Sequence, residues 1–175
     1  MYNAKSSEAR KTVAILGAFC FFLSTIEYII PKPLPFMRLG IANLPLMLAL
    51  DIFPLNTFLG LVAVKVLGQA LITGTLFSYI FLFSLTGTLL SALSMYGLRR
   101  LLGRNRVSLI CIGTMGAMVS NTSQLCLGWV FIFRNSVWHI APIFLAAGIV
   151  TGAVLGFFCE QFIRRSKWYE ARRVR

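Results

Sequence analysis

Acidic residues are scarce in this sequence. Five Asp and Glu side chains stand against 17 Lys and Arg among 175 residues, and Asp51 is the one aspartate. Hard cations such as Mg²⁺ are held by several oxygen ligands, mostly carboxylates. A chain with so few carboxylates lacks the paired acidic clusters on which metal-dependent diphosphate chemistry depends. This scarcity excludes catalysis of that class.

Histidine and cysteine are also few and scattered. The sequence has one histidine, and its four cysteines lie singly in hydrophobic runs with no Cys-x-x-Cys pair. A metal site needs several such ligands close together, and a nucleophilic triad needs a base beside a Ser or Cys. We therefore predict no metal site, no cofactor and no catalytic residue. The side chains concerned are His139, Cys20, Cys111, Cys126 and Cys159.

Charged residues make up only 13% of the chain, whereas 58% of it is hydrophobic. Soluble domains carry roughly 25% charged residues, and a helix needs about 20 apolar residues to cross a bilayer. We predict one all-α domain over residues 1–175, a polytopic membrane protein with six transmembrane helices. The helices are expected at 12–30, 39–53, 54–73, 77–98, 107–133 and 141–163, with a basic tail over 164–175. The second is the weakest because it is short and contains Pro45.

The net charge of +12 is concentrated in three clusters. Positive residues accumulate in cytoplasmic segments, and six crossings put all three clusters, and both termini, on that side. Topology thus explains the charge without a nucleic-acid partner. The clusters are Lys5, Arg10 and Lys11; Arg99, Arg100, Arg104 and Arg106; and Arg164, Arg165, Lys167, Arg172, Arg173 and Arg175. Lys32, Arg38 and Arg134 remain in outward loops, which suggests contact with anionic lipid headgroups or an anionic ligand.

Lys65 lies midway along the third predicted helix. A charged side chain at a helix centre costs about 3 kcal/mol to insert into a bilayer, so it faces protein or water and marks a candidate site. Gln69 follows four residues later on the same helical face. We predict that both line a substrate pocket. The alternative is that Lys65 snorkels to the interface or pairs with a buried residue such as Glu27.

The fifth predicted helix carries five consecutive polar residues at 120–124. Asn121 and Gln124 are three residues apart and share a face, so their amides can donate and accept hydrogen bonds in a cavity. The alternative is hydrogen bonding between helices, which is common in membranes at about 0.6 kcal/mol per bond. Both interpretations put these side chains inside the bundle.

Small residues mark two faces where another helix can approach closely. Ala14 and Ala18 are four residues apart on the first predicted helix. The sixth helix repeats glycine at the same interval, at Gly148, Gly152 and Gly156. We expect the glycine face to pack within the bundle. The alanine pair is equally suited to contact with a second membrane protein.

The stretch over residues 30–43 reads IPKPLPFMRLGIAN. It resembles the signature of the heptaprenyl diphosphate synthase component I family, also called the Gx transporter family. That family is similar in fold to the substrate-binding S components of energy-coupling factor (ECF) transporters. The resemblance therefore implies a six-helix S-component-like bundle in a bacterial cytoplasmic membrane, with the loop over 31–38 as a lid.

S components bind a micronutrient from outside and associate with a transmembrane T component and two ATPases. The resemblance implies those partners here, with Ala14 and Ala18 matching the Ala-x-x-x-Ala motif that contacts the T component. The ligand would be a small micronutrient or isoprenoid-related compound, anionic if the outward cations bind it. We expect six substrate-binding residues: Arg38, Asn43, Lys65, Gln69, Asn121 and Gln124.

The family's name implies a different activity. A prenyl-transferring enzyme needs aspartate-rich clusters for Mg²⁺, and this chain has only Asp51. The alternative function is therefore a non-catalytic membrane accessory subunit of a heptaprenyl diphosphate synthase.

Overall fold

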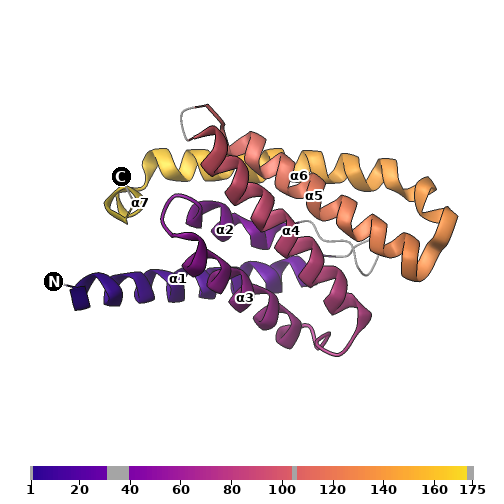
Figure 1. Cartoon of the computed structure of the whole chain (residues 1–175), viewed down its shortest axis with the longest axis horizontal. Coiled ribbons are helices and arrows are strands. Elements are labelled where there is room, and N and C mark those ends of the chain that lie inside the picture. The colour runs from indigo at the N-terminus through magenta and orange to yellow at the C-terminus, as the bar shows by residue number, and fades with distance from the viewer. Residues whose placement is uncertain (1, 31–39, 104–105, 173–175) are drawn as a thin grey trace.

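The structure is a computed structural model that describes residues 2–30, 40–103 and 106–172. Within these ranges it consists of helices and short connections, with no strand. The longer helices are α1 (Tyr2–Ile29), α3 (Leu55–Ile72), α4 (Tyr79–Leu102), α5 (Leu109–Gly128) and α6 (Val137–Arg165). In Figure 1, α1 and α6 run roughly along the length of the molecule, whereas α3, α4 and α5 cross it obliquely. Shorter elements are η1 (Ile41–Asn43), α2 (Leu44–Ala49), the π-helical η2 (Trp129–Phe133), η3 (Arg134–Ser136) and α7 (Lys167–Arg172).

Several helix ends follow from local sequence. Ser78 caps α4 by accepting a hydrogen bond from the backbone N–H of Ile80, and Ser108 caps α5 by accepting one from Cys111. Serine is favoured at this position because its hydroxyl satisfies a backbone donor that the first turn leaves unpaired. Gly103 ends α4 with a φ of 74°, a conformation that glycine adopts without steric cost.

Four helices are long and apolar enough to cross a membrane: the Arg10–Ile29 part of α1, and α3, α4 and α6. The chain is therefore a helical membrane protein. The fifth predicted helix is present as α5 but is not among these four, and its polar run over 120–124 lowers its mean hydropathy.

The second predicted helix differs most from the expectation. Instead of one helix over 39–53, the structure has the short turn η1 and the six-residue α2. Six residues rise only about 9 Å, so α2 cannot cross a bilayer by itself. Pro45 explains the late start, because it occupies the first turn, where its missing N–H is not needed. The prediction of six membrane-spanning helices is not confirmed.

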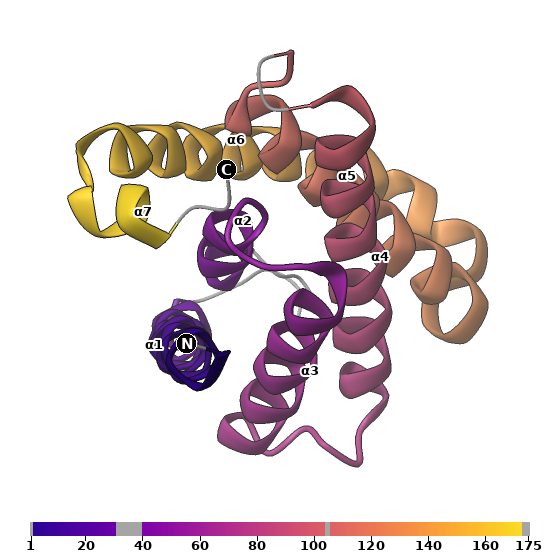
Figure 2. The same ribbon diagram turned by 60° about the vertical axis from the view of Figure 1, so that its left-hand side comes forward.

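The segment α2 forms the centre of the bundle instead. Figure 2 shows α2 lying between α1 and α6, with α3 and α4 to one side of it and α7 to the other. Leu46, Met47, Leu48 and Ala49 are all buried and belong to the main hydrophobic core. A short apolar helix enclosed by longer ones needs no amphipathic pattern, which is why its sequence resembles a membrane span.

The glycine face of α6 packs against α5, as expected. A methyl group on Gly152 would stand 2.6 Å from the carbonyl oxygen of Gly113, and one on Gly156 would stand 2.4 Å from the Cα of Ile110. One on Gly148 would stand 2.3 Å from the Nδ2 of Asn121. The two backbones are therefore in direct contact, which only residues without a side chain permit.

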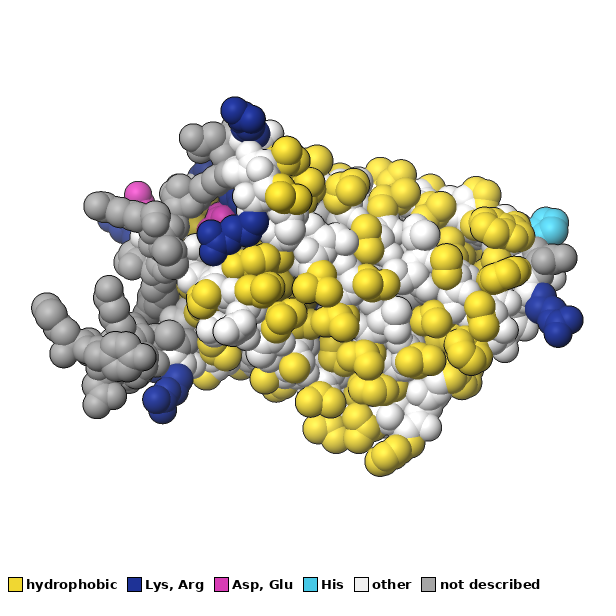
Figure 3. Space-filling view, viewed as in Figure 1, with side chains coloured by type: hydrophobic (Ala, Val, Ile, Leu, Met, Phe, Trp, Pro, Cys, Tyr) yellow, Lys and Arg dark blue, Asp and Glu magenta, His cyan; other side chains and the backbone are white. Residues whose placement is uncertain are grey.

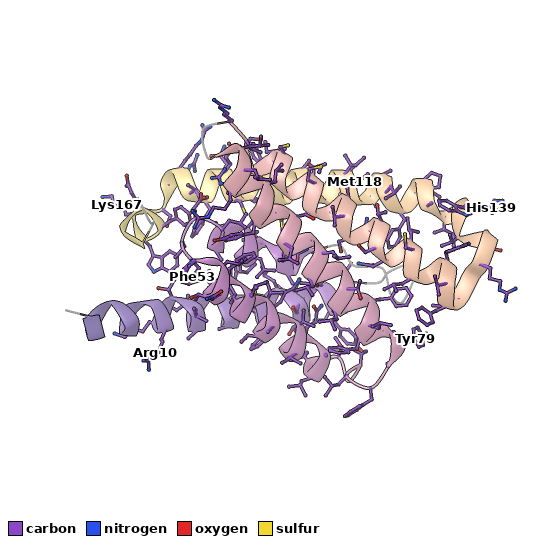
Figure 4. The ribbon with its side chains drawn as sticks, in the orientation of Figure 1. Arg10, Phe53, Tyr79, Met118, His139 and Lys167 are labelled. Carbon is purple, nitrogen blue, oxygen red and sulfur yellow. The ribbon has the colours of Figure 1, made fainter. Side chains whose placement is uncertain are left out.

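The two ends of the bundle differ in charge. On the face in Figure 3, Lys and Arg side chains gather at the end that carries both termini, hydrophobic side chains cover the middle, and the histidine lies at the opposite end. Figure 4 labels Arg10 and Lys167 at the first end and His139 at the other. This pattern agrees with the charge clusters seen in the sequence.

A buried ion pair closes the basic end. The guanidinium of Arg99 donates to both carboxylate oxygens of Asp51, at 2.8 and 2.7 Å, and to the backbone oxygen of Val107 at 2.9 Å. The hydroxyl of Tyr169 in α7 donates to Asp51 at 3.3 Å. Burial and the neighbouring carboxylate raise the pKa of Tyr169 well above its usual value near 10. The expected basic tail thus begins as helix and is joined to the core.

Candidate functional site in the polar interior

The carboxylate of Glu27 holds the segment of chain that begins at Gly40. Its side chain is 1% exposed near the end of α1. One carboxylate oxygen accepts from the backbone N–H of Gly40 and the other from that of Ala42, both at 3.2 Å. Gly40 has a φ of 79°, which favours glycine and turns its N–H towards the carboxylate. Glu27 therefore positions the turn that begins η1.

Asn43, the last residue of that turn, contacts the charged residue of α3. The ammonium group of Lys65 donates to the side-chain oxygen of Asn43, and Lys65 is only 3% exposed. Lys65 therefore does not snorkel to the membrane interface. Glu27 and Lys65 bind to opposite ends of the turn over 40–43, which joins α1 to α3 through polar contacts. Gln69, one helical turn beyond Lys65, is also buried.

The two predicted amides of α5 are buried and make different contacts. Asn121 donates through Nδ2 to the backbone oxygen of Phe144 in α6 at 2.8 Å, so it joins two helices as the alternative interpretation expected. Gln124 donates through Nε2 to the hydroxyl of Ser120 at 3.1 Å. Its Oε1 is buried with no hydrogen-bond partner in the described structure. Most buried polar atoms are paired. The Oε1 of Gln124 is an exception, an acceptor in the interior that a ligand could use.

A polar face on α4 was missed from the sequence. Ser84, Thr88 and Ser91 are all buried, and the hydroxyls of Ser84 and Ser91 have no partner among the described residues. Their spacing of four and three residues identifies one side of a helix, so the pattern was present in the sequence. It was overlooked because single hydroxyls cost little in a membrane helix, unlike a charged side chain.

Residues of η1, α2, α4, α5 and α6 enclose a small cavity of about 20 Å³, enough for roughly one water-sized group. Its polar side chains, within the parts of the chain that the structure describes, are amides and hydroxyls and none is charged. Met47 and Met95 contribute its apolar wall, and glycines of α5 leave the space open. The polar lining side chains are Asn43, Ser91, Ser120, Asn121 and Thr151.

The structure thus brings part of the predicted site together. Asn43 and Asn121 line one cavity, and Lys65 reaches it through Asn43. Gln69 and Gln124 are buried but do not line this cavity. Arg38 and the predicted lid over 31–38 lie outside the described residues.

The predicted partner contact lies on the outside of α1. Ala14 and Ala18 are exposed, whereas Gly17 between them is buried. A methyl group on Gly17 would stand 3.5 Å from Val64 of α3. The glycine therefore faces the bundle, and the alanine pair faces away from it.

A family model described as heptaprenyl diphosphate synthase component I matches residues 16–162. The chain belongs to this family. The match confirms the resemblance carried by residues 30–43 and covers most of the chain. Component I is considered a non-catalytic subunit, which agrees with the prediction that the chain is not an enzyme. Searches of curated proteins and of solved structures gave no match.

Proposed function

We propose that this family member is the substrate-binding membrane subunit of an ECF-type importer, and that it captures a small micronutrient or isoprenoid-related compound from outside. The observation that carries this proposal is the polar interior between η1, α3, α4 and α5. Leaving a buried polar group without a partner costs about 1–3 kcal/mol. Among the described residues, buried atoms of Ser84, Ser91 and Gln124 have no hydrogen-bond partner in this interior, and neither has the hydroxyl of Ser24 on α1. A bundle that tolerates them is suited to a ligand that completes their hydrogen bonds.

The proposal includes a topology of six crossings. We count the segment formed by η1 and α2 as one of them, a crossing completed by protein contacts rather than by lipid. Backbone that is not one continuous helix is tolerated at membrane depth when it is buried in protein, and α2 is buried. Both termini then lie on the cytoplasmic side of a bacterial cytoplasmic membrane, in agreement with the positive-inside rule.

The energy for import has to come from partner chains, because the sequence has no phosphate-binding loop of the G-x-x-x-x-G-K type. We propose that a T component and two ATPases supply it. Ala14 and Ala18 are small and exposed on α1, which lets a second helix approach closely.

Ligand binding is tested by native mass spectrometry of the full chain purified in mild detergent. Lys65→Ala removes the ammonium group beside Asn43 and is expected to lose a retained small molecule that the unchanged protein carries. Lys167→Ala is the matched control, because Lys167 is exposed in α7 and its loss leaves the interior intact. An unchanged protein that carries no small molecule, or equal retention by both variants, contradicts the proposal.

Partner coupling is tested by co-purification. Ala14→Leu with Ala18→Leu is expected to abolish association with the T component and ATPases while the retained ligand stays bound. Ala63→Leu with Ala146→Leu is the control, since these alanines are exposed on α3 and α6. Equal co-purification of both double variants counts against the proposed contact.

A second function is favoured by the family's description. In that case the chain is a non-catalytic membrane subunit that recruits a soluble component II, the catalytic partner implied by a synthase of two components. Co-purification from membranes separates the two functions. A stoichiometric prenyl-transferring enzyme supports the accessory role, whereas a T component with ATPases supports import.

A further inference from the structure

An apolar groove lies on the surface between the η1–α2 segment and α6. Its volume is about 440 Å³ and its lining is almost entirely hydrocarbon. Val150, Val154 and Phe158 of α6 form one wall and are 61%, 48% and 59% exposed, and Ile41 and Leu44 form the other. A wall so exposed on a membrane-spanning helix faces lipid. Figure 2 shows α2 and α6, the elements that form the two walls of the groove, as neighbours.

The groove and the polar cavity share a wall. Thr151 and Leu155 line both of them, so a single layer of side chains separates the hydrocarbon groove from the amides and hydroxyls inside. On the cavity side, Ser91 is 1% exposed and its hydroxyl has no hydrogen-bond partner among the described residues. A molecule that occupied both spaces would contact Thr151 and Leu155.

The depth of the shared wall excludes a phospholipid headgroup from the cavity. Thr151 is the middle residue of α6, which runs from Val137 to Arg165, so it lies about 21 Å from either helix end. The charged headgroup of a phospholipid stays at the membrane surface, because a charge near the bilayer centre is costly. A molecule that uses both spaces therefore has a head that tolerates burial at mid-depth.

The cavity also selects the chemistry of the head. Its described polar side chains are neutral, and about 20 Å³ accommodates one oxygen-bearing group but not a diphosphate. Cavities of about 150 Å³ hold benzene, so the groove has room for roughly three times as many carbons, about 17. The space suits one chain of intermediate length.

We infer that the groove and cavity together bind an isoprenoid amphiphile with an uncharged hydroxyl or carbonyl head, its chain along α6 and its head oxygen bonded to Ser91. This inference rests on the proposed function and names the ligand class of that site. The isoprenoid chain is preferred over a straight one because the family is named for a synthase that makes such chains.

The test uses tritiated farnesol, a branched alcohol of 15 carbons, with the full chain in detergent micelles. Val154→Trp fills the groove, and it leaves the core unchanged because Val154 is half exposed. We expect saturable binding by the unchanged protein and a Kd raised about tenfold or more by Val154→Trp. Ile149→Trp is the matched control, since Ile149 is 46% exposed on α6 outside the groove, and it should change the Kd less than twofold. Ser91→Ala should weaken binding by roughly twofold to tenfold, the loss of one hydrogen bond.

Competition with hexadecanol and farnesyl diphosphate tests the two chemical claims. Hexadecanol and farnesyl diphosphate should both compete more weakly than unlabelled farnesol, the first for lack of branching and the second because of its charge. Equal competition by hexadecanol, stronger competition by the diphosphate, or equal binding by Val154→Trp and Ile149→Trp overturns the inference. Should Val154→Trp fail to fold, Val150→Trp replaces it, because Val150 is more exposed still.

Failure of this inference is distinguishable from failure of the proposed function. A retained molecule that depends on Lys65 but is unaffected by Val154→Trp leaves the importer proposal standing and overturns the isoprenoid ligand. Farnesol binding without any T component or ATPases in the membrane extract supports the ligand class and contradicts the importer.

Discussion

Replacing Gly152 with alanine should destabilise the bundle, although alanine is the better helix former. The new methyl group would stand 2.6 Å from the oxygen of Gly113 and 2.8 Å from the Cα of Thr114. Both neighbours are backbone atoms and cannot rotate away. Ordinary contacts begin at 3.4 Å, so α5 and α6 must separate by 3.4 − 2.6, about 0.8 Å, with a loss of dispersion contacts along the interface.

The expected free-energy change combines two opposing effects. Overpacking costs about 1–3 kcal/mol, whereas glycine to alanine within a helix returns up to about 1 kcal/mol. We expect a net loss near 1 kcal/mol, which for a chain of 175 residues lowers the thermal midpoint by about 2–4 °C. Gly97→Ala in α4 is the control, because nothing lies within 4 Å of its added methyl group, and it should raise the midpoint.

The measurement is thermal unfolding in detergent micelles at one heating rate, followed by circular dichroism for both variants. A Gly152→Ala protein as stable as the Gly97→Ala protein would refute the close contact of α5 with α6. Because the polar cavity lies between these helices, the same separation should also weaken binding of the retained ligand.

Two further predictions concern the basic end. Asp51→Leu or Arg99→Met alone should destabilise the protein by about 3–5 kcal/mol, because each removes the opposite charge from a largely buried ion pair. The double variant should lose less than the sum by about 1–3 kcal/mol in unfolding measurements, and additive losses would contradict the ion pair. The raised pKa of Tyr169 means that the folded protein holds this proton more tightly than the unfolded chain. The contribution of this hydroxyl to the free energy of unfolding should therefore be fully present below pH 10. It should fall as the pH rises above 10, by up to about 1.4 kcal/mol per pH unit. Tyr169→Phe should lack this part of the slope, and identical pH profiles would count against the buried hydroxyl.

Sequence patterns predicted most long helices and part of the interior. The helices α3, α4 and α6 appear close to the expected ranges because an apolar run of about 20 residues has one stable form in lipid. Lys65 and Asn121 are buried, Asn43 is partly buried, and all three lie at or beside one cavity, since a polar side chain inside such a run must face protein. The expected helix over 39–53 was wrong in extent, because hydrophobicity does not distinguish a lipid-facing span from a short helix buried in protein.

The site's finer arrangement was not predictable from these patterns. The sequence suggests Glu27 as a partner for Lys65, and the hydrogen bonds that its carboxylate accepts from the backbone at residues 40 and 42 are seen only in the structure. Ser84 and Ser91 carry no charge to draw attention. Only the structure shows that both hydroxyls are buried with no hydrogen-bond partner among the described residues, and that Ser91 lines the cavity.

By itself the sequence determined that this protein is helical, membrane-embedded and basic at its ends, and it determined the family through residues 30–43 and the match over 16–162. These properties follow from composition and from residues near one another in the chain. Only the tertiary structure decided that Asp51 pairs with Arg99 and receives Tyr169, partners 48 and 118 residues away. It also decided that a hydrocarbon groove and a polar cavity share the wall formed by Thr151 and Leu155. Such pairings depend on the order in which helices pack side by side, and neither hydropathy nor local spacing contains that order.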